Sequence, residues 1–266
     1  MTLNKELVDD PANWRLSMLL EPDAIEVFAH RLVGEAPVVA ARLPLSATAP
    51  QAEAFEEAVY ANPLLLMPFQ KTDLLISTAD ALIAPPDVEE EPLRQLLGFE
   101  NDKSLIFSEI DDRNSVAFLA PRGVANFVGR TFDKLQPRHV LSVLARYSLV
   151  RSQRGNTAKA YVCLGKKSLS LLVLNNLGLV MARHFDDVGI DEAAYWILAV
   201  FRHCGLDPQA DEIFIAGDGD RRHQLTPRLS KFVNYVMPAI FPSAAYHGDA
   251  QAMKAAFPLT ILPLCE

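Results

Sequence analysis

Cysteine is scarce in this sequence, and the motifs of the familiar catalytic centres are missing. The 266 residues include three cysteines, Cys163, Cys204 and Cys265, with no CxxC pair among them. An odd number without paired spacing fits neither a disulfide framework nor a four-thiolate zinc site, so we expect reduced packing residues. The sequence also has no GxSxG, HExxH, GxxxxGK[ST] or dinucleotide GxGxxG motif, and it therefore predicts no catalytic residue and no metal ligand set.

The sequence also has fewer basic than acidic residues and lacks a long apolar run. Lys and Arg number 25 against 33 Asp and Glu, and the formal charge of -8 argues against a surface that follows nucleic acid phosphates. The most apolar stretch, 168–182, is interrupted by Asn175 and Asn176 and is shorter than the roughly 20 residues that cross a bilayer. The first 13 residues lack the positive head and apolar run of a secretory signal. We therefore expect a cytoplasmic protein with no nucleic acid partner and no membrane span.

The apolar pattern of the first half predicts three strands, a helix and a further strand. Half of the residues are hydrophobic and 22% are charged, which is typical of a folded globular protein. Short apolar segments separated by turn residues predict a β-meander, and helical spacing then gives way to an extended segment. The predicted elements are strands at 15–20, 25–32 and 37–43, a helix at 51–60 and a strand at 72–76.

The same order recurs in the second half. The predicted elements are strands at 159–164, 169–174 and 179–184, a helix at 190–204 and a strand at 212–216. Asn175 and Gly178 are residues that tight hairpins favour, and Gly205 follows the helix where a left-handed residue is common. The repetition predicts a duplicated βββαβ module, although a mixed α/β protein without duplication remains open on pattern alone.

Beyond the repeated modules, the two halves are predicted to continue alike only in outline, with helices between them that connect the halves. We predict helices at 88–97, 124–132, 140–150 and 229–236, and extended segments at 104–107, 116–119 and 259–262. Pro and Gly mark breaks at Pro85-Pro86, Gln136-Pro137 and Arg154-Gly155-Asn156. The predicted organisation is an N-terminal extension (1–13), a first half (14–135), a connecting helix and linker (136–157) and a second half (158–266).

Four segments carry a resemblance to a known family. They are the strand Leu16-Ser17-Met18, the segment 161–183, the acidic helix start at 191–196, and 213–218. With them the chain resembles domain of unknown function 3822, a bacterial family that is similar to the actin-like ATPase fold. The resemblance implies an α/β protein with two similar halves, each a ribonuclease-H-like βββαβ module. It implies no established activity.

The resemblance also says where a nucleotide would bind, and the residues there are degenerate. The first hairpin turn, Glu21-Pro22-Asp23, has no glycine, carries two acids and loses one backbone donor to proline, so it should repel a triphosphate. The second turn keeps one glycine, a hydroxyl and two cations but lacks the expected aspartate, and the adenosine-type turn has a charge in place of a small residue. The candidate degenerate nucleotide or anion cleft is Gly165, Lys166, Lys167, Ser168, Gly217, Asp218 and Gly219.

Several polar groups have simpler interpretations than a site. The run 184–187 places His184 near two carboxylates, and we favour helix capping by the acids over metal binding. Asp218-Gly219-Asp220 lacks the spacing of a calcium loop and is interpreted as a turn. Lys166 and Lys167 are expected at a solvated hairpin tip, and the run 221–223 on a wet surface.

These observations favour a catalytically silent actin-like protein that holds a protein partner or a second copy of itself, with no bound cofactor. ATP hydrolysis is disfavoured because the acid that it needs is missing. Two alternatives stay open. One is a nucleotide-binding switch that uses the cleft between the halves, and the other is a small-molecule enzyme of unknown reaction.

Overall fold

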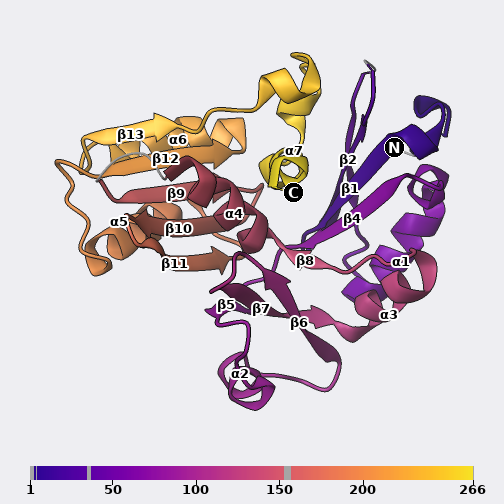
Figure 1. The fold of residues 1–266 in the computed structure, drawn as a ribbon, viewed down its shortest axis with the longest axis horizontal. Coiled ribbons are helices and arrows are strands. Elements are labelled where there is room, and N and C mark those ends of the chain that lie inside the picture. Colours follow the sequence, from indigo (N-terminus) through magenta and orange to yellow (C-terminus); the bar gives the residue numbers. More distant parts are fainter. Residues whose placement is uncertain (1–2, 4, 35–36, 153–156, 266) are drawn as a thin grey trace.

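Two five-stranded sheets lie on either side of a pair of helices, α4 (Val140–Ser152) and α7 (Phe257–Ile261) (Figure 1). The computed structural model describes residues 3, 5–34, 37–152 and 157–265. The break predicted at 154–156 lies outside the described residues, as do residue 153 of the predicted linker and residues 1, 2 and 4 of the predicted extension.

The first sheet contains the predicted meander. Its strands are β1 (Trp14–Leu20), β2 (Ala24–Arg31), β3 (Val39–Pro44), β4 (Lys71–Ile76) and β8 (Arg138–His139), in the order β3-β2-β1-β4-β8. The first three strands are antiparallel, and β4 joins β1 in parallel after the helix α1 (Gln51–Ala61). Every residue of β1 is buried, including the polar Arg15 and Ser17, because this central strand is covered on both faces. The charge of Arg15 is paired with Asp73 of the neighbouring strand β4 at 2.7 Å.

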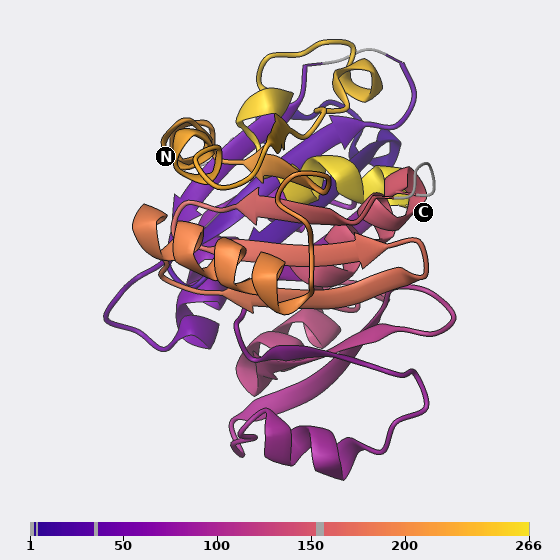
Figure 2. The ribbon, with the colours of Figure 1, turned by 90° about the vertical axis from the view of Figure 1, so that its left-hand side faces the viewer.

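The second sheet repeats this topology. Its strands are β9 (Lys159–Leu164), β10 (Leu169–Asn175), β11 (Gly178–Phe185), β12 (Glu212–Gly217) and β13 (Tyr235–Pro238), in the order β11-β10-β9-β12-β13. Two helices, α5 (Ile190–His203) and α6 (Gly219–Leu229), pack on its outer face, and α5 lies in front of the sheet in Figure 2. The predicted α/β fold with two similar halves is confirmed.

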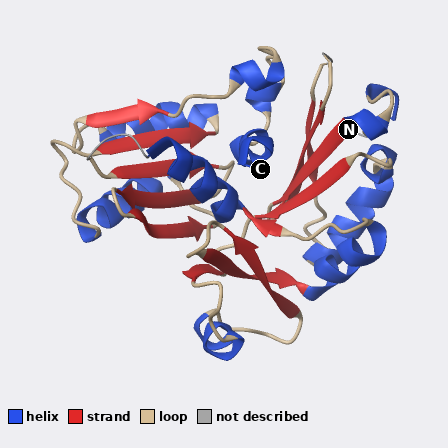
Figure 3. Ribbon diagram, in the orientation of Figure 1, coloured by secondary structure: helices blue, strands red, loops and turns tan. Residues whose placement is uncertain are grey.

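A third, smaller sheet departs from the expectation that both halves continue alike. It contains β5 (Ala81–Ala84), β6 (Lys103–Glu109) and β7 (Ser115–Pro121) in the order β5-β7-β6, with α2 (Glu90–Leu96) beside it. The sheet is inserted between β4 and α3 (Arg122–Thr131), and Figure 3 shows it below the two large sheets. Within the described part of the second half, the chain instead passes from β12 through α6 directly to β13.

Two predicted elements have the wrong type. The segment 229–236, predicted as a helix, contains the last residue of α6, a turn and the start of strand β13. The segment 259–262, predicted as a strand, lies in α7 and at the start of the 3-10 helix that follows it. The sequence of α6 is polar and contains Pro227, which hides its helical period. A run of four apolar residues is too short for periodicity to separate a helix from a strand. The remaining short 3-10 helices are Lys5–Leu7, Pro11–Asn13, Pro63–Leu66, Ser243–Tyr246, Ala252–Lys254 and Leu262–Cys265.

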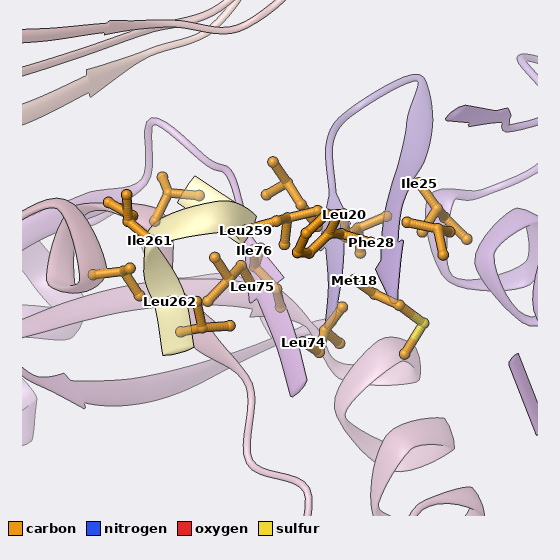
Figure 4. Close-up of a cluster of buried hydrophobic side chains, with 14 of the residues drawn as sticks. Met18, Leu20, Ile25, Phe28, Leu74, Leu75, Ile76, Leu259, Ile261 and Leu262 are labelled. Carbon is orange, nitrogen blue, oxygen red and sulfur yellow. The ribbon is translucent and has the colours of Figure 1, made fainter. Parts of the chain in front are cut away.

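The main core runs through the joint between the halves. Leu259 and Ile261 of α7 are fully buried and pack with Leu20 and Leu75 of the first sheet in one apolar cluster (Figure 4). The same cluster includes residues of α4 and Cys163 of the second sheet. The two halves are therefore joined by a shared core rather than by a linker alone. Of the described helices, none has the length and apolar character needed to cross a membrane.

Candidate functional site

The candidate site is the cleft where two equivalent hairpin turns face each other. β1 ends at Leu20 and turns into β2, and β9 ends at Leu164 and turns into β10. A cavity of about 310 Å³ lies here, lined by both turns, by the turn from β12 into α6 and by the segment 253–258. The predicted residues that line it are Gly165, Lys166, Ser168, Gly217, Asp218 and Gly219. Lys167 is directed elsewhere and lines a neighbouring cavity of about 290 Å³ that also contains Asp23.

Two of the cleft glycines, Gly165 and Gly217, are needed by the chain's own packing. Gly217 has φ +91°, a backbone conformation that other residues rarely adopt, and a β-carbon there would collide with the carbonyl of Leu164. A β-carbon on Gly165 would collide with the hydroxyl of Ser168 and lie 3.0 Å from the Oε1 atom of Glu21. The carboxylate of the first turn therefore lies against the backbone of the second turn.

An arginine of the first sheet neutralises the acids of the first turn. Arg42 Nη1 lies 2.5 Å from Glu21 Oε2 and 2.5 Å from Glu26 Oε1, and its Nη2 donates to Asp23 at 2.7 Å. Burial raises the pKa of Glu26 above its usual value, although the hydrogen bond from Arg42 opposes the shift. Glu26 and Arg42 are cross-strand partners on β2 and β3, so this ion pair follows from the register of the hairpin.

The cations of the second turn are exposed, as predicted, but both are paired with acids. Lys166 Nζ lies 2.6 Å from Asp218 Oδ2, and Lys167 Nζ lies 3.3 Å from Asp23 Oδ2 at the neighbouring cavity. Burial alone would raise the pKa of Asp218, but hydrogen bonds from Lys166 and from the Arg221 amide lower it. The bond from that amide makes Asp218 the N-cap of α6, so the interpretation of 218–220 as an ordinary turn is wrong.

Arg221 is a structural residue of the site, not part of a wet surface. Its side chain is buried, and its guanidinium donates to the carbonyl oxygens of Gly165 (2.8 Å), Ser168 (2.9 Å) and Val188 (2.5 Å). These bonds hold the second turn against the N-terminus of α6. The prediction for 221–223 is wrong at this residue because a run of charges gives no indication that buried carbonyls lie within reach of one of them.

A buried histidine bridges the halves next to the cleft. His184 Nε2 lies 2.8 Å from Ser77 Oγ of the first half and 3.2 Å from Asp186 Oδ1, while Nδ1 lies 2.8 Å from Ser170 Oγ. Asp186 also accepts from the Ala79 amide at 2.8 Å. The capping interpretation of 184–187 is therefore wrong, since the N-cap of α5 is at residue 189 and the acid is used in the joint.

The cleft combines four acids with cations that are mostly paired. A phosphate entering it would meet Glu21, Glu26, Asp218 and Asp220. Arg42 and Lys166 are engaged by carboxylates, whereas Lys254 lines the cleft without an ion pair among the described residues. Across the described residues, His, Cys, Asp and Glu side chains form no group of three placed to hold a metal ion. The sequence interpretation missed Glu26 and Arg42, although opposite charges at matching positions of a predicted hairpin are a usable signal.

Known structures show which fold this is. A protein of unknown function with an actin-like ATPase fold from Bacteroides thetaiotaomicron has a TM-score of 0.76 at 15% identity, over 87% of this chain and 94% of that chain. The PilM-PilN type IV pilus biogenesis complex gives a TM-score of 0.56 at 14% identity, over 94% and 96% of the two chains. At these identities the likeness establishes the actin-like ATPase fold alone.

Sequence comparison identifies the family. A search of curated proteins returned no match. The model of the family described as "Protein of unknown function (DUF3822)" matches residues 6–236, which is most of the chain. The chain therefore belongs to this DUF3822 family, as its resemblance had implied.

Proposed function

We propose that this protein works by binding a protein partner or a second copy of itself, and that its cleft does not hydrolyse ATP. The observation that carries the proposal is the internal charge pairing of the cleft. The carboxylate of Glu21 in the first turn lies against Gly165 of the second turn. In a nucleotide site, the space between these two turns would have to hold the phosphates. Lys166 and Lys167 are held by Asp218 and Asp23.

A triphosphate that took its counter-charges from Arg42, Lys166 or Lys167 would have to break these pairs. Arg42 is shared by three carboxylates, so releasing it for a phosphate would leave Glu21 and Glu26 unpaired in a partly buried place. Leaving a buried charge without a partner costs several kcal/mol, about 3–5 in measured cases. The cleft is therefore arranged against a polyanion.

Binding of another protein is supported by a structural relative. The PilM-PilN complex contains a chain of this fold in an assembly with a different protein, and a fold can keep such a surface role without its ligand chemistry. We also infer a cytoplasmic location, supported by free thiols at Cys163, Cys204 and Cys265 in the described part of the chain.

The proposal is tested by equilibrium dialysis of the full chain against Mg-ATP. We expect no saturable retention by the wild type, and a gain in Glu21→Gln, which removes the charge that faces the second turn. Glu57→Gln on the exposed side of α1 is the matched control and should behave as the wild type does. Tight, saturable binding by the wild type would overturn the proposal. Sedimentation at several concentrations separates self-association from binding of another protein, which affinity capture of the tagged chain and mass spectrometry would then identify.

A second candidate is a nucleotide-responsive switch, which the 310 Å³ cavity between the halves favours. A nucleotide that binds only the native state, present at a concentration of about 100 times its dissociation constant, raises the free energy of unfolding by about 2.7 kcal/mol. A thermal-shift series with ATP, ADP and GTP that shows such a gain would favour the switch over the partner-binding protein.

A further inference from the structure

A second cavity, of about 270 Å³, lies between α4 and the second sheet, and no step above uses it. Its walls come from α4, from β9, β10 and β12, and from residues 239, 240 and 257. Among the residues that the structure describes, Cys163 and Phe257 alone line both this cavity and the cleft. The volume is close to the lower end of ligand pockets, about 300 Å³, and suits a metabolite rather than a larger ligand.

One wall carries a pair of stacked aromatic rings. Tyr161 on β9 and Phe214 on β12 are cross-strand partners, with ring centroids 5.2 Å apart and ring planes at 16°. Ile213 and Ile215 on either side of Phe214 face the opposite core under α5 and α6, so the alternation of the strand sends the aromatic rings into the cavity. Both rings are only half-buried, and Leu144 and Leu172 complete the apolar lining.

The opening of the cavity carries an arginine with no acidic partner. The guanidinium of Arg151 stacks on the ring of Tyr147 at 3.5 Å from the centroid, which fixes its position without neutralising its charge. Within the described ranges, no carboxylate forms an ion pair with Arg151. Lys159, the other cation of the lining, lies 3.9 Å from Glu212. Arg151 therefore differs from Arg42 and Lys166 at the cleft, which are both paired with carboxylates.

We propose that this cavity binds a small organic anion, with its flat apolar body against Tyr161 and Phe214 and its carboxylate at Arg151. The rings provide an apolar surface that tolerates different planar bodies, and the guanidinium provides paired donors that match the two oxygens of a carboxylate. A neutral molecule of the same shape loses the second contribution and keeps the first.

The test compares 2-naphthoate with 2-naphthamide by isothermal titration of the full chain. The two probes share the aromatic body and differ in charge. We expect the wild type to bind the carboxylate about tenfold more tightly than the amide, a difference of about 1.4 kcal/mol. Arg151→Gln should remove this preference and leave the affinity for the amide unchanged. Phe214→Leu keeps the site apolar but removes the ring, and should weaken both probes to a similar degree.

Arg202→Gln is the control for net charge, because Arg202 is exposed on α5 and does not line the cavity. It should retain the preference of the wild type. The proposal is overturned if neither probe binds at millimolar concentration, if the wild type binds both equally, or if Arg202→Gln loses as much preference as Arg151→Gln. Arg151 is exposed, so its replacement is expected to fold, and circular dichroism of each variant checks this.

Discussion

Replacing Arg221 by methionine should destabilise the protein by about 2–3 kcal/mol. Methionine keeps an unbranched apolar stem but removes the donors to three carbonyl oxygens. A buried acceptor left without a donor costs about 1–3 kcal/mol. The carbonyl of Ser168 still receives the Gly165 amide at 3.1 Å, and Gly165 borders the cavity, where water can replace the lost donor. The main loss is at Val188, which is buried.

Urea unfolding followed by circular dichroism measures the effect. With an m value of about 3 kcal/mol per molar, the midpoint should fall by roughly 0.7–1 M. Arg202→Met carries the same change of charge on an exposed position of α5 and should shift the midpoint very little. A loss below about 1 kcal/mol in Arg221→Met, or an equal loss in the control, would show that Arg221 does not hold the turn in the way its three bonds indicate.

Three further expectations concern the backbone, the core and the acid response. Gly217→Ala should lower the free energy of unfolding, measured in urea, by about 3 kcal/mol or more, because the strain of a positive φ and a collision with a carbonyl add together. Gly98→Ala, where φ is +63° and the space around the residue is open, is the control and should lower it by about 1 kcal/mol. Similar losses in the two variants would contradict the packing argument. Leu259→Ala should cost about 3–5 kcal/mol, since Leu259 is fully buried in the joint, and a loss under 1 kcal/mol would place it outside the shared core. Burial lowers the pKa of His139 to about 3 and the pKa of His30 to about 4 from the usual 6.5. Between these values and pH 6.5 both histidines bind a proton in the unfolded chain but not in the folded chain. The free energy of unfolding should therefore fall as the pH drops from about 6.5 towards 4. Each histidine contributes up to about 1.4 kcal/mol per pH unit, His139→Gln should make the measured slope shallower, and an unchanged slope would mean that His139 is not held neutral.

The repeated part of the fold could be predicted because its signals are local. The strands of both meanders alternate with turn residues, and the helix α5 has apolar residues at regular spacing, so most predicted bounds lie within two residues of those observed. α6 was missed because its sequence is polar, because the residues that lead into it, 217–219, include two glycines, and because Pro227 lies inside it. Of the inserted sheet, β6 and β7 were predicted as separate extended segments and β5 was missed. Pairing between strands that are distant in the sequence gives no periodic pattern from which the sheet could be predicted.

The candidate site was predictable in position but not in its chemistry. The hairpin turns follow from counting strands in each half, and this brought Gly165, Ser168 and Gly217 to one cleft. The partners of the charged residues depend on the distance between the halves. No sequence pattern indicates that Lys167 reaches Asp23 or that Arg221 turns inward to three carbonyls.

The hydrogen bonds at His184 have a consequence for how the chain folds. The hairpins of each sheet join neighbouring strands, but the bonds from Ser77 to His184 and from Ala79 to Asp186 each span 107 positions. Closing so long a loop costs more chain entropy than closing a hairpin, and that cost is recovered only when the contacts at both ends are complete. We therefore expect each meander to form early, and the docking of one half on the other to be the slow final event of refolding.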